Sequence, residues 1–190
     1  MENQALKNIL TRHSVREFTG EAIKKEDLLT ILKAGMSAPS AVNRQPWSFV
    51  VVENKETLEA LSAKLPYAKM LSGAGTAIVV CGTPDKSKIF NAAVKMVTRI
   101  SLGDFWVTDC SAASENILLA AHALGLGAVW TAVFPNEGLI KSVREILEIP
   151  DDIIPLNVIP IGVPANKNEP PKDKFKEKNI HWEKWRGQER

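Results

Sequence analysis

Two arginines and a serine near the start of the chain have the types and spacing to bind an anion. Arg12, Ser14 and Arg16 lie within five residues of one another. A guanidinium is a rigid fork of N–H donors that matches phosphate geometry, and a serine hydroxyl adds a further donor. A second polar stretch, Asn43-Arg44-Gln45-Pro46-Trp47, follows downstream. Together they predict an anion cradle built on loops, with a phosphorylated cofactor as the first candidate ligand. The alternative is a pair of solvated surface charges.

The expected elements place both stretches on loops. Apolar residues at helical spacing predict a helix over 3–11, which ends where the first stretch begins. A second helix is predicted over 25–36, and it stops at Ala38-Pro39 because a residue before proline avoids the α region. The segment 37–46 is therefore a loop, and it leads into a β-rich run at 48–52.

The rest of the chain alternates helices with short apolar strands, which indicates an α+β or α/β fold with one sheet covered by helices. Small residues over 108–124 predict the longest helix, and Gly125-Leu126-Gly127 ends it. Residues 86–101 are compatible with a helix. The other expected elements are helices at 55–64 and 137–147 and strands at 77–81, 128–133 and 154–161.

Length and charge limit what the chain can do. Its 190 residues fit one domain, expected over 1–190, with a Pro-, Lys- and Glu-rich arm over 163–190. Lys and Arg outnumber Asp and Glu by only 24 to 22, too little to indicate a nucleic acid or an anionic membrane as partner. The N-terminus lacks the pattern of a signal peptide, and Cys81 and Cys110 indicate buried, reduced thiols. We therefore expect a cytoplasmic protein.

The remaining polar and aromatic residues indicate structural roles. The three histidines and two cysteines show no metal-ligand spacing, so no metal site is expected. No GxGxxG fingerprint predicts a Rossmann site for a dinucleotide. We expect His13 to have a structural or backbone-positioning role, and His122 to be a hydrogen-bonded histidine of the core. In the arm, His181, Trp182 and Trp185 are too apolar to stay in water, and they should dock on this subunit or on another copy.

Three blocks of residues occur in order along the chain. They are Arg12-His13-Ser14-x-Arg16-x-Phe18, Ala38-Pro39-Ser40-Ala41-x-Asn43-x-Gln45-Pro46-Trp47, and Asp109-Cys110-x-Ala112-x-x-x-Asn116-x-x-Leu119-x-Ala121-x-x-Leu124-Gly125-Leu126-Gly127-x-x-Trp130. Together the blocks resemble the nitroreductase family of FMN-dependent oxidoreductases over nearly the whole chain. The resemblance implies a homodimer with an α+β fold, a central mixed or antiparallel sheet flanked by helices, and a C-terminal arm exchanged between subunits. It also implies one FMN per subunit and a ping-pong cycle, in which hydride from NADH or NADPH reduces the flavin before a nitroaromatic, a quinone or another small acceptor is reduced.

The resemblance assigns cofactor-binding roles, and it needs no catalytic side chain because the flavin carries the chemistry. Arg12 and Ser14 would meet the phosphate and ribityl chain, with His13 between them. Arg16 would lie at the N1/O2 edge of the ring, where a guanidinium stabilises the reduced flavin. The loop at 39–43 would approach from the partner subunit. The remaining cofactor-binding candidates are Pro39, Ser40, Asn43, Gln45, Lys69, Trp130, Thr131, Ala132, Lys172 and Lys174.

Several assignments leave an alternative open. Gln45 and the Pro46-Trp47 pair can equally anchor the start of a strand, and Lys172 and Lys174 can be solvated charges. Many relatives carry an acidic residue at the position that aligns with Ala132, so a contact supported by that carboxylate is missing here. One alternative function is therefore a flavin-storage or redox-regulatory protein without a dedicated acceptor. Another is a family member that dehalogenates or dehydrogenates a specific metabolite.

Overall fold

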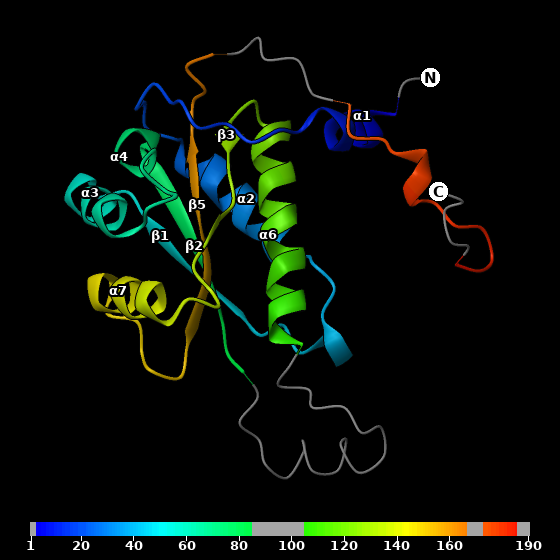
Figure 1. Cartoon of the computed structure of the whole chain (residues 1–190). Coiled ribbons are helices and arrows are strands. Elements are labelled where there is room, and N and C mark those ends of the chain that lie inside the picture. Colours follow the sequence, from blue (N-terminus) through cyan, green and yellow to red (C-terminus); the bar gives the residue numbers. More distant parts are fainter. Residues whose placement is uncertain (1–2, 85–104, 167–172, 186–190) are drawn as a thin grey trace, which may run out of the picture.

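The computed structural model describes residues 3–84, 105–166 and 173–185, and within these ranges five antiparallel strands form the central sheet (Figure 1). The strand order is β1 (Trp47–Val52), β2 (Thr76–Gly82), β5 (Ile154–Gly162) and β3 (Gly127–Ala128). The short strand β4 (Thr131–Ala132) also pairs with β5. This sheet confirms the expected α+β class.

The strand β2 lies inside the sheet, and all of its residues are buried. Val79 is paired with Val50 of β1 on one side and with Val158 of β5 on the other. Because successive side chains of a strand point to opposite faces, Ile78 and Val80 pack into one core cluster while Val79 packs into the other. The apolar residues of β2 thus contribute side chains to the core on both faces of the sheet.

Helices cover both faces of this sheet (Figure 1). On one face α2 (Lys25–Met36) and α6 (Trp106–Ala123) pack against each other and against the strands. On the other face lie α3 (Lys55–Lys64), α4 (Leu71–Ala74) and α7 (Glu137–Leu147). The long helix α6 is therefore packed firmly against α2 and the sheet, and it can hold the polar segments that contact it in fixed positions.

The N-terminal helix and the C-terminal arm lie outside these layers. The helix α1 (Gln4–Thr11) contacts α6 but contains no buried residue. Beyond it, the segments 17–19 and 163–165 run antiparallel: Thr19 N–H donates to the Val163 carbonyl and Ala165 N–H to the Glu17 carbonyl, both at 2.9 Å. The arm continues past the 3-10 turn η3 (Glu177–Asn179), away from the sheet (Figure 1).

Most predicted elements are confirmed, with two corrections. The expected strand at 128–133 is wrong, because β3 and β4 are separated at Val129-Trp130. Opposite them in β5 lies Pro160, which has no N–H to offer, so the ladder is interrupted there. The four-residue helix α4 was not predicted, since it is too short for a periodic pattern. The helix expected at 86–101 lies outside the described residues. None of the described helices is both long and apolar enough to cross a bilayer.

Candidate functional site

The first basic stretch borders a small cavity beside the start of the C-terminal arm. The cavity has a volume of about 200 Å³. The backbone of this stretch is fixed at its centre, because Val15 N–H donates to the Ala128 carbonyl of β3 at 3.1 Å. The lining residues are His13, Ser14, Val15, Arg16, Glu17 and Asn166.

Within this cavity, Ser14 and Arg16 keep their donors available. Neither side chain has a hydrogen bond or ion pair within the part of the chain that the structure describes. At the rim, Asn166 Nδ2 donates to Glu17 Oε2 at 2.9 Å, so one carboxylate oxygen is already engaged. The cavity therefore presents an unpaired hydroxyl and an unpaired guanidinium, a donor pair that suits an anion.

The other two members of the basic stretch already have partners. Arg12 Nε lies 3.4 Å from Oε1 of Glu115 on α6, and only 17% of the Arg12 side chain is exposed. His13 Nδ1 lies 3.1 Å from the Thr11 carbonyl and donates to it, since a carbonyl only accepts. The four predicted residues thus divide into two that are held by the protein and two that are free to bind.

One face of α6 holds the end of α1 in place. Besides the Glu115 ion pair, the Leu119 carbonyl accepts from Asn8 Nδ2 at 3.0 Å. One turn further along, His122 Nε2 lies 2.9 Å from Thr11 Oγ1. Positions 115, 119 and 122 lie on one side of a helix, so α6 positions the residues that follow α1 through three successive contacts.

The hydrogen bonds around His122 define its tautomer. Thr11 Oγ1 donates its proton to the Lys7 carbonyl at 2.8 Å, so it accepts from His122, whose Nε2 carries the hydrogen. Burial lowers the pKa of His122, and the neighbouring His13 and Arg12 lower this pKa further. His122 is therefore hydrogen-bonded, as predicted, but it is only partly buried and does not belong to the core, because it lies on the face of α6 that contacts α1.

The second polar stretch is a strained turn. Val42, Asn43 and Gln45 have φ angles of 47°, 56° and 52°. These values lie in the left-handed region, which residues other than glycine rarely adopt, a β-branched valine least of all. Ser40 Oγ accepts from Gln45 N–H at 2.9 Å, and Gln45 Nε2 donates to Asn43 Oδ1 at 3.1 Å. The structure thus brings Pro39, Ser40, Asn43 and Gln45 together in one hydrogen-bonded turn.

Among the residues proposed around the ring, most side chains are committed to packing. Trp47 and Trp130 are partly buried against the same core cluster, which supports the structural alternative for the Pro46-Trp47 pair. Thr131 is buried, and its hydroxyl donates to the Val158 carbonyl at 2.5 Å. The side chain of Ala132, in contrast, is exposed. Of positions 130–132, Ala132 is the one whose side chain is open to a ligand.

The structure does not bring Lys69 or Lys174 to the lining of this cavity. Lys69 Nζ donates to the carbonyls of Ser62 at 2.9 Å and Ala63 at 3.4 Å, at the end of α3. It lies with the helices that cover the face of the sheet opposite α6. Lys174 is exposed on the arm, and Lys172 lies outside the described residues.

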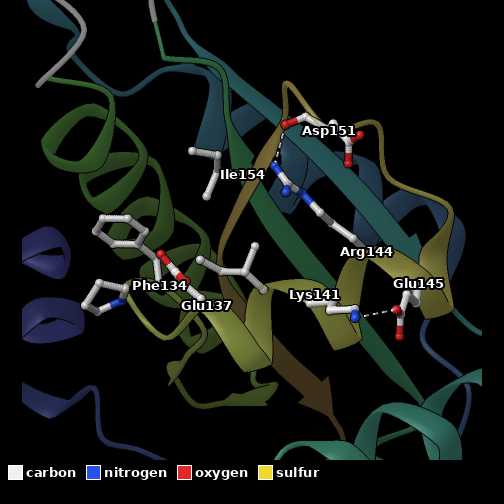
Figure 2. Close-up of a pocket in the computed structure, with 9 residues that line it drawn as sticks. Phe134, Glu137, Lys141, Arg144, Glu145, Asp151 and Ile154 are labelled. Atoms are coloured by element: carbon white, nitrogen blue, oxygen red, sulfur yellow. Dashed lines mark hydrogen bonds and ion pairs between the residues drawn. The ribbon is translucent and has the colours of Figure 1, made fainter.

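A larger cavity, of about 700 Å³, lies along α7 (Figure 2). Arg144 donates to the carbonyls of Asp151 and Ile153, and Lys141 Nζ lies 3.8 Å from Glu145 Oε1. Both cations of the lining are therefore engaged, and its three carboxylates outnumber them. This groove does not suit an anionic ligand.

Sequence reasoning missed Glu115 and Asn166, which shape the site. It named Asp109 in the third block but assigned it no role, and in the structure Asp109 Oδ1 accepts from Ala41 N–H at 3.1 Å. Glu115 and His122 are two helical turns apart in the sequence, and this spacing could have predicted that both lie on the same face of one helix. No local sequence pattern, however, predicts that the segments 17–19 and 163–165 pair and so bring Asn166 beside the basic stretch.

The cysteines are buried and free, as predicted. Burial raises the pKa of both Cys81 and Cys110 to about 12, so these thiols are protonated at neutral pH. No group of three His, Cys, Asp or Glu side chains suited to a metal ion occurs among the described residues.

Comparison with known proteins identifies the family. The sequence model of the Nitroreductase family matches residues 9–163. A protein of Archaeoglobus fulgidus, provisionally named NADH dehydrogenase/NAD(P)H nitroreductase, is 44% identical over 96% of this chain and 99% of its own length. A crystal structure from Bacteroides thetaiotaomicron with the same provisional name is 45% identical, with a TM-score of 0.85 over 97% of this chain and 100% of that one. An FMN-dependent nitroreductase from Clostridium difficile R20291 is 28% identical, with a TM-score of 0.80 over 95% and 99% of the two chains. This chain belongs to the nitroreductase family.

Proposed function

We propose that this protein is an FMN-dependent oxidoreductase that uses NADH or NADPH to reduce small acceptors such as nitroaromatics or quinones in a ping-pong cycle. The observation that carries the proposal is that one cavity is lined by Ser14 and Arg16, whose hydroxyl and guanidinium have no partner among the described residues. Family membership and the FMN-dependent relative support the choice of ligand. When bound, FMN supplies the hydride-accepting and electron-donating chemistry.

The residues present fit FMN as a ligand. Ser14 would donate to the phosphate or ribityl oxygens, and Arg12, already oriented by Glu115, would add positive charge beside them. Arg16 would stabilise the negative charge of the reduced ring. The Asn43 carboxamide, on the strained turn, can both donate and accept.

We further propose that a second copy of the chain completes the site. The cavity at Arg16 holds about 200 Å³, whereas pockets for ligands of this size usually hold roughly 300–1,000 Å³. Large apolar side chains of α1 and the arm are exposed, including Leu10 at 74% and Trp185 at 84%. A homodimer with an exchanged arm would cover these side chains and bring the partner's loop to the cavity.

Steady-state kinetics of the FMN-loaded protein test this function. NADH or NADPH should be oxidised only when both FMN and an acceptor, such as a nitroaromatic or a quinone, are supplied. Parallel lines in double-reciprocal plots would support the ping-pong order. Tight FMN binding without turnover by any acceptor would favour the storage or regulatory alternative, which the exposed Ala132 in place of an acidic residue leaves open.

A further inference from the structure

The strained turn needs an external support. Its own hydrogen bonds join Asn43 N–H to the Ser40 carbonyl at 3.0 Å and Arg44 N–H to the Ala41 carbonyl at 3.1 Å. Such bonds close the turn on itself but do not fix its position against the rest of the protein. Left-handed residues other than glycine persist only when the surrounding structure holds them, and they gather at functional sites.

Asp109 supplies such a support. It lies in the first turn of α6, is only 7% exposed, and accepts the Ala41 N–H at 3.1 Å through Oδ1. A carboxylate acceptor makes a stronger hydrogen bond than a neutral one. Six residues along the same helix, Glu115 holds Arg12. One helix thus connects the two segments that the proposed function assigns to FMN.

We propose that Asp109 is a positioning residue, which holds the turn at 40–45 in the geometry that contacts FMN. The inference rests on the proposed function, because FMN is the ligand for which the turn would be held. Asp109 itself contacts no ligand in this account. It acts through Ala41, and its effect should reach Ser40 and Asn43 on either side.

The decisive experiment compares variants that break this hydrogen bond from either side. Asp109→Ala removes the acceptor, and Ala41→Pro removes the donor. The extended backbone of Ser40, with φ −143° and ψ 154°, is compatible with a following proline, and the proline ring would also push the Asp109 carboxylate away from the turn. Asp109→Asn retains an oxygen acceptor for the Ala41 N–H, and it should therefore preserve the position of the turn and the binding of FMN. Ser114→Ala is the control, since it removes a buried hydroxyl from the same helix that is bonded to Asn157 and not to the turn.

Two readouts separate positioning from loss of stability. Amide hydrogen exchange of residues 38–46 in the FMN-free protein should speed up in Asp109→Ala and Ala41→Pro, but not in Asp109→Asn or Ser114→Ala. In the FMN-loaded protein, the first two variants should weaken FMN binding by about tenfold, because the turn is no longer held in the binding geometry before FMN binds, and should change the visible circular dichroism of the flavin.

The outcomes distinguish this inference from the proposed function. If the unmodified protein takes up no FMN, the proposed function fails and the inference fails with it. If the unmodified protein binds FMN, but all four variants bind it equally with an unchanged flavin spectrum, the inference alone is overturned. Rescue by Asp109→Asn together with an unaffected Ser114→Ala would support it.

Discussion

At the scale of single residues, the site depends on which donors remain unpaired. Arg12 and Arg16 are the same residue type four positions apart, yet Arg12 is held by Glu115 while Arg16 has no partner within the described ranges. The sequence allowed both to be named, because guanidinium groups near a serine suit phosphate. It could not assign their different roles, because Glu115 is about a hundred residues away in the chain.

Arg16→Ala should change the reduction potential of the bound flavin more than it changes the affinity of the protein for FMN. Loss of the positive charge at the ring should lower the two-electron reduction potential by about 30 mV, which corresponds to about 1.4 kcal/mol, and should slow flavin reduction. FMN affinity should fall only partly, because Ser14 and Arg12 remain. Spectroelectrochemistry measures the potential, with Lys64→Ala on the surface of α3 as control. An unchanged potential would show that Arg16 does not face the ring.

The histidine that supports α1 should make stability depend on pH. Its folded-state pKa is lowered below the ordinary 6.5, so the unfolded chain takes up a proton first as the pH falls. The contribution of neutral His122 is therefore present above about pH 6.5 and is lost on acidification below it. His122→Gln retains an N–H donor for Thr11 without titrating. Its melting temperature should fall less than that of the unmodified protein between about pH 7 and pH 5. Equal losses in calorimetry would refute this role.

At the scale of elements, the local sequence pattern was sufficient to predict the bounds of several helices, but it was insufficient to predict how the strands pair. The bounds of α2, α3 and α7 were predicted as observed, because the apolar periodicity is clear within each segment and Asn136 marks the start of α7 as its N-cap. The break between β3 and β4 depends on Pro160, which becomes their neighbour only in the folded sheet. The same holds for the turn at 40–45, whose tether to α6 is non-local.

The packing of Gly127 in β3 against Val15 in the basic stretch can be tested by substitution. A Cβ on Gly127 would lie 2.6–3.1 Å from three carbon atoms of Val15, whose β-branched side chain has little freedom to move. Gly127→Ala should therefore destabilise the fold by about 1–3 kcal/mol and weaken FMN binding by displacing Ser14 and Arg16. Denaturant unfolding and FMN titration measure the two effects.

Matched variants show whether the clash with Val15 is the cause. Gly73→Ala places its new Cβ in open space and should change the free energy of unfolding by less than about 0.5 kcal/mol. Adding Val15→Ala to Gly127→Ala should recover part of the lost stability. A double variant whose loss equals the sum of the two single losses would contradict the proposed packing.

At the scale of the whole molecule, exposed apolar side chains support the proposed homodimer. The helix α1 has no buried residue, and Leu10 and Trp185 are largely exposed. Scattered exposed apolar residues are ordinary, but two tryptophans at 80% and 84% exposure on one arm are not. We expect a dimer of the 20.9 kDa chain, in which both apolar segments are covered.

Sedimentation velocity of variants tests this assembly. Leu10→Glu and Trp185→Glu each bring a charge into the proposed interface, and should shift the protein toward monomer while weakening FMN binding. Tyr67→Glu, at a 77% exposed aromatic residue outside α1 and the arm, is the control and should leave the dimer intact. Monomers that bind FMN as tightly as the parent would show that one copy is sufficient.

The most direct test of the central claim is the anaerobic absorbance of the FMN-loaded protein on addition of NADH or NADPH. We expect one FMN per chain, bleached by at least one of the two nucleotides at a rate fast enough for turnover, with the colour returning when a quinone or nitroaromatic is added. A protein that binds no FMN, or a bound flavin that neither nucleotide bleaches, would contradict it.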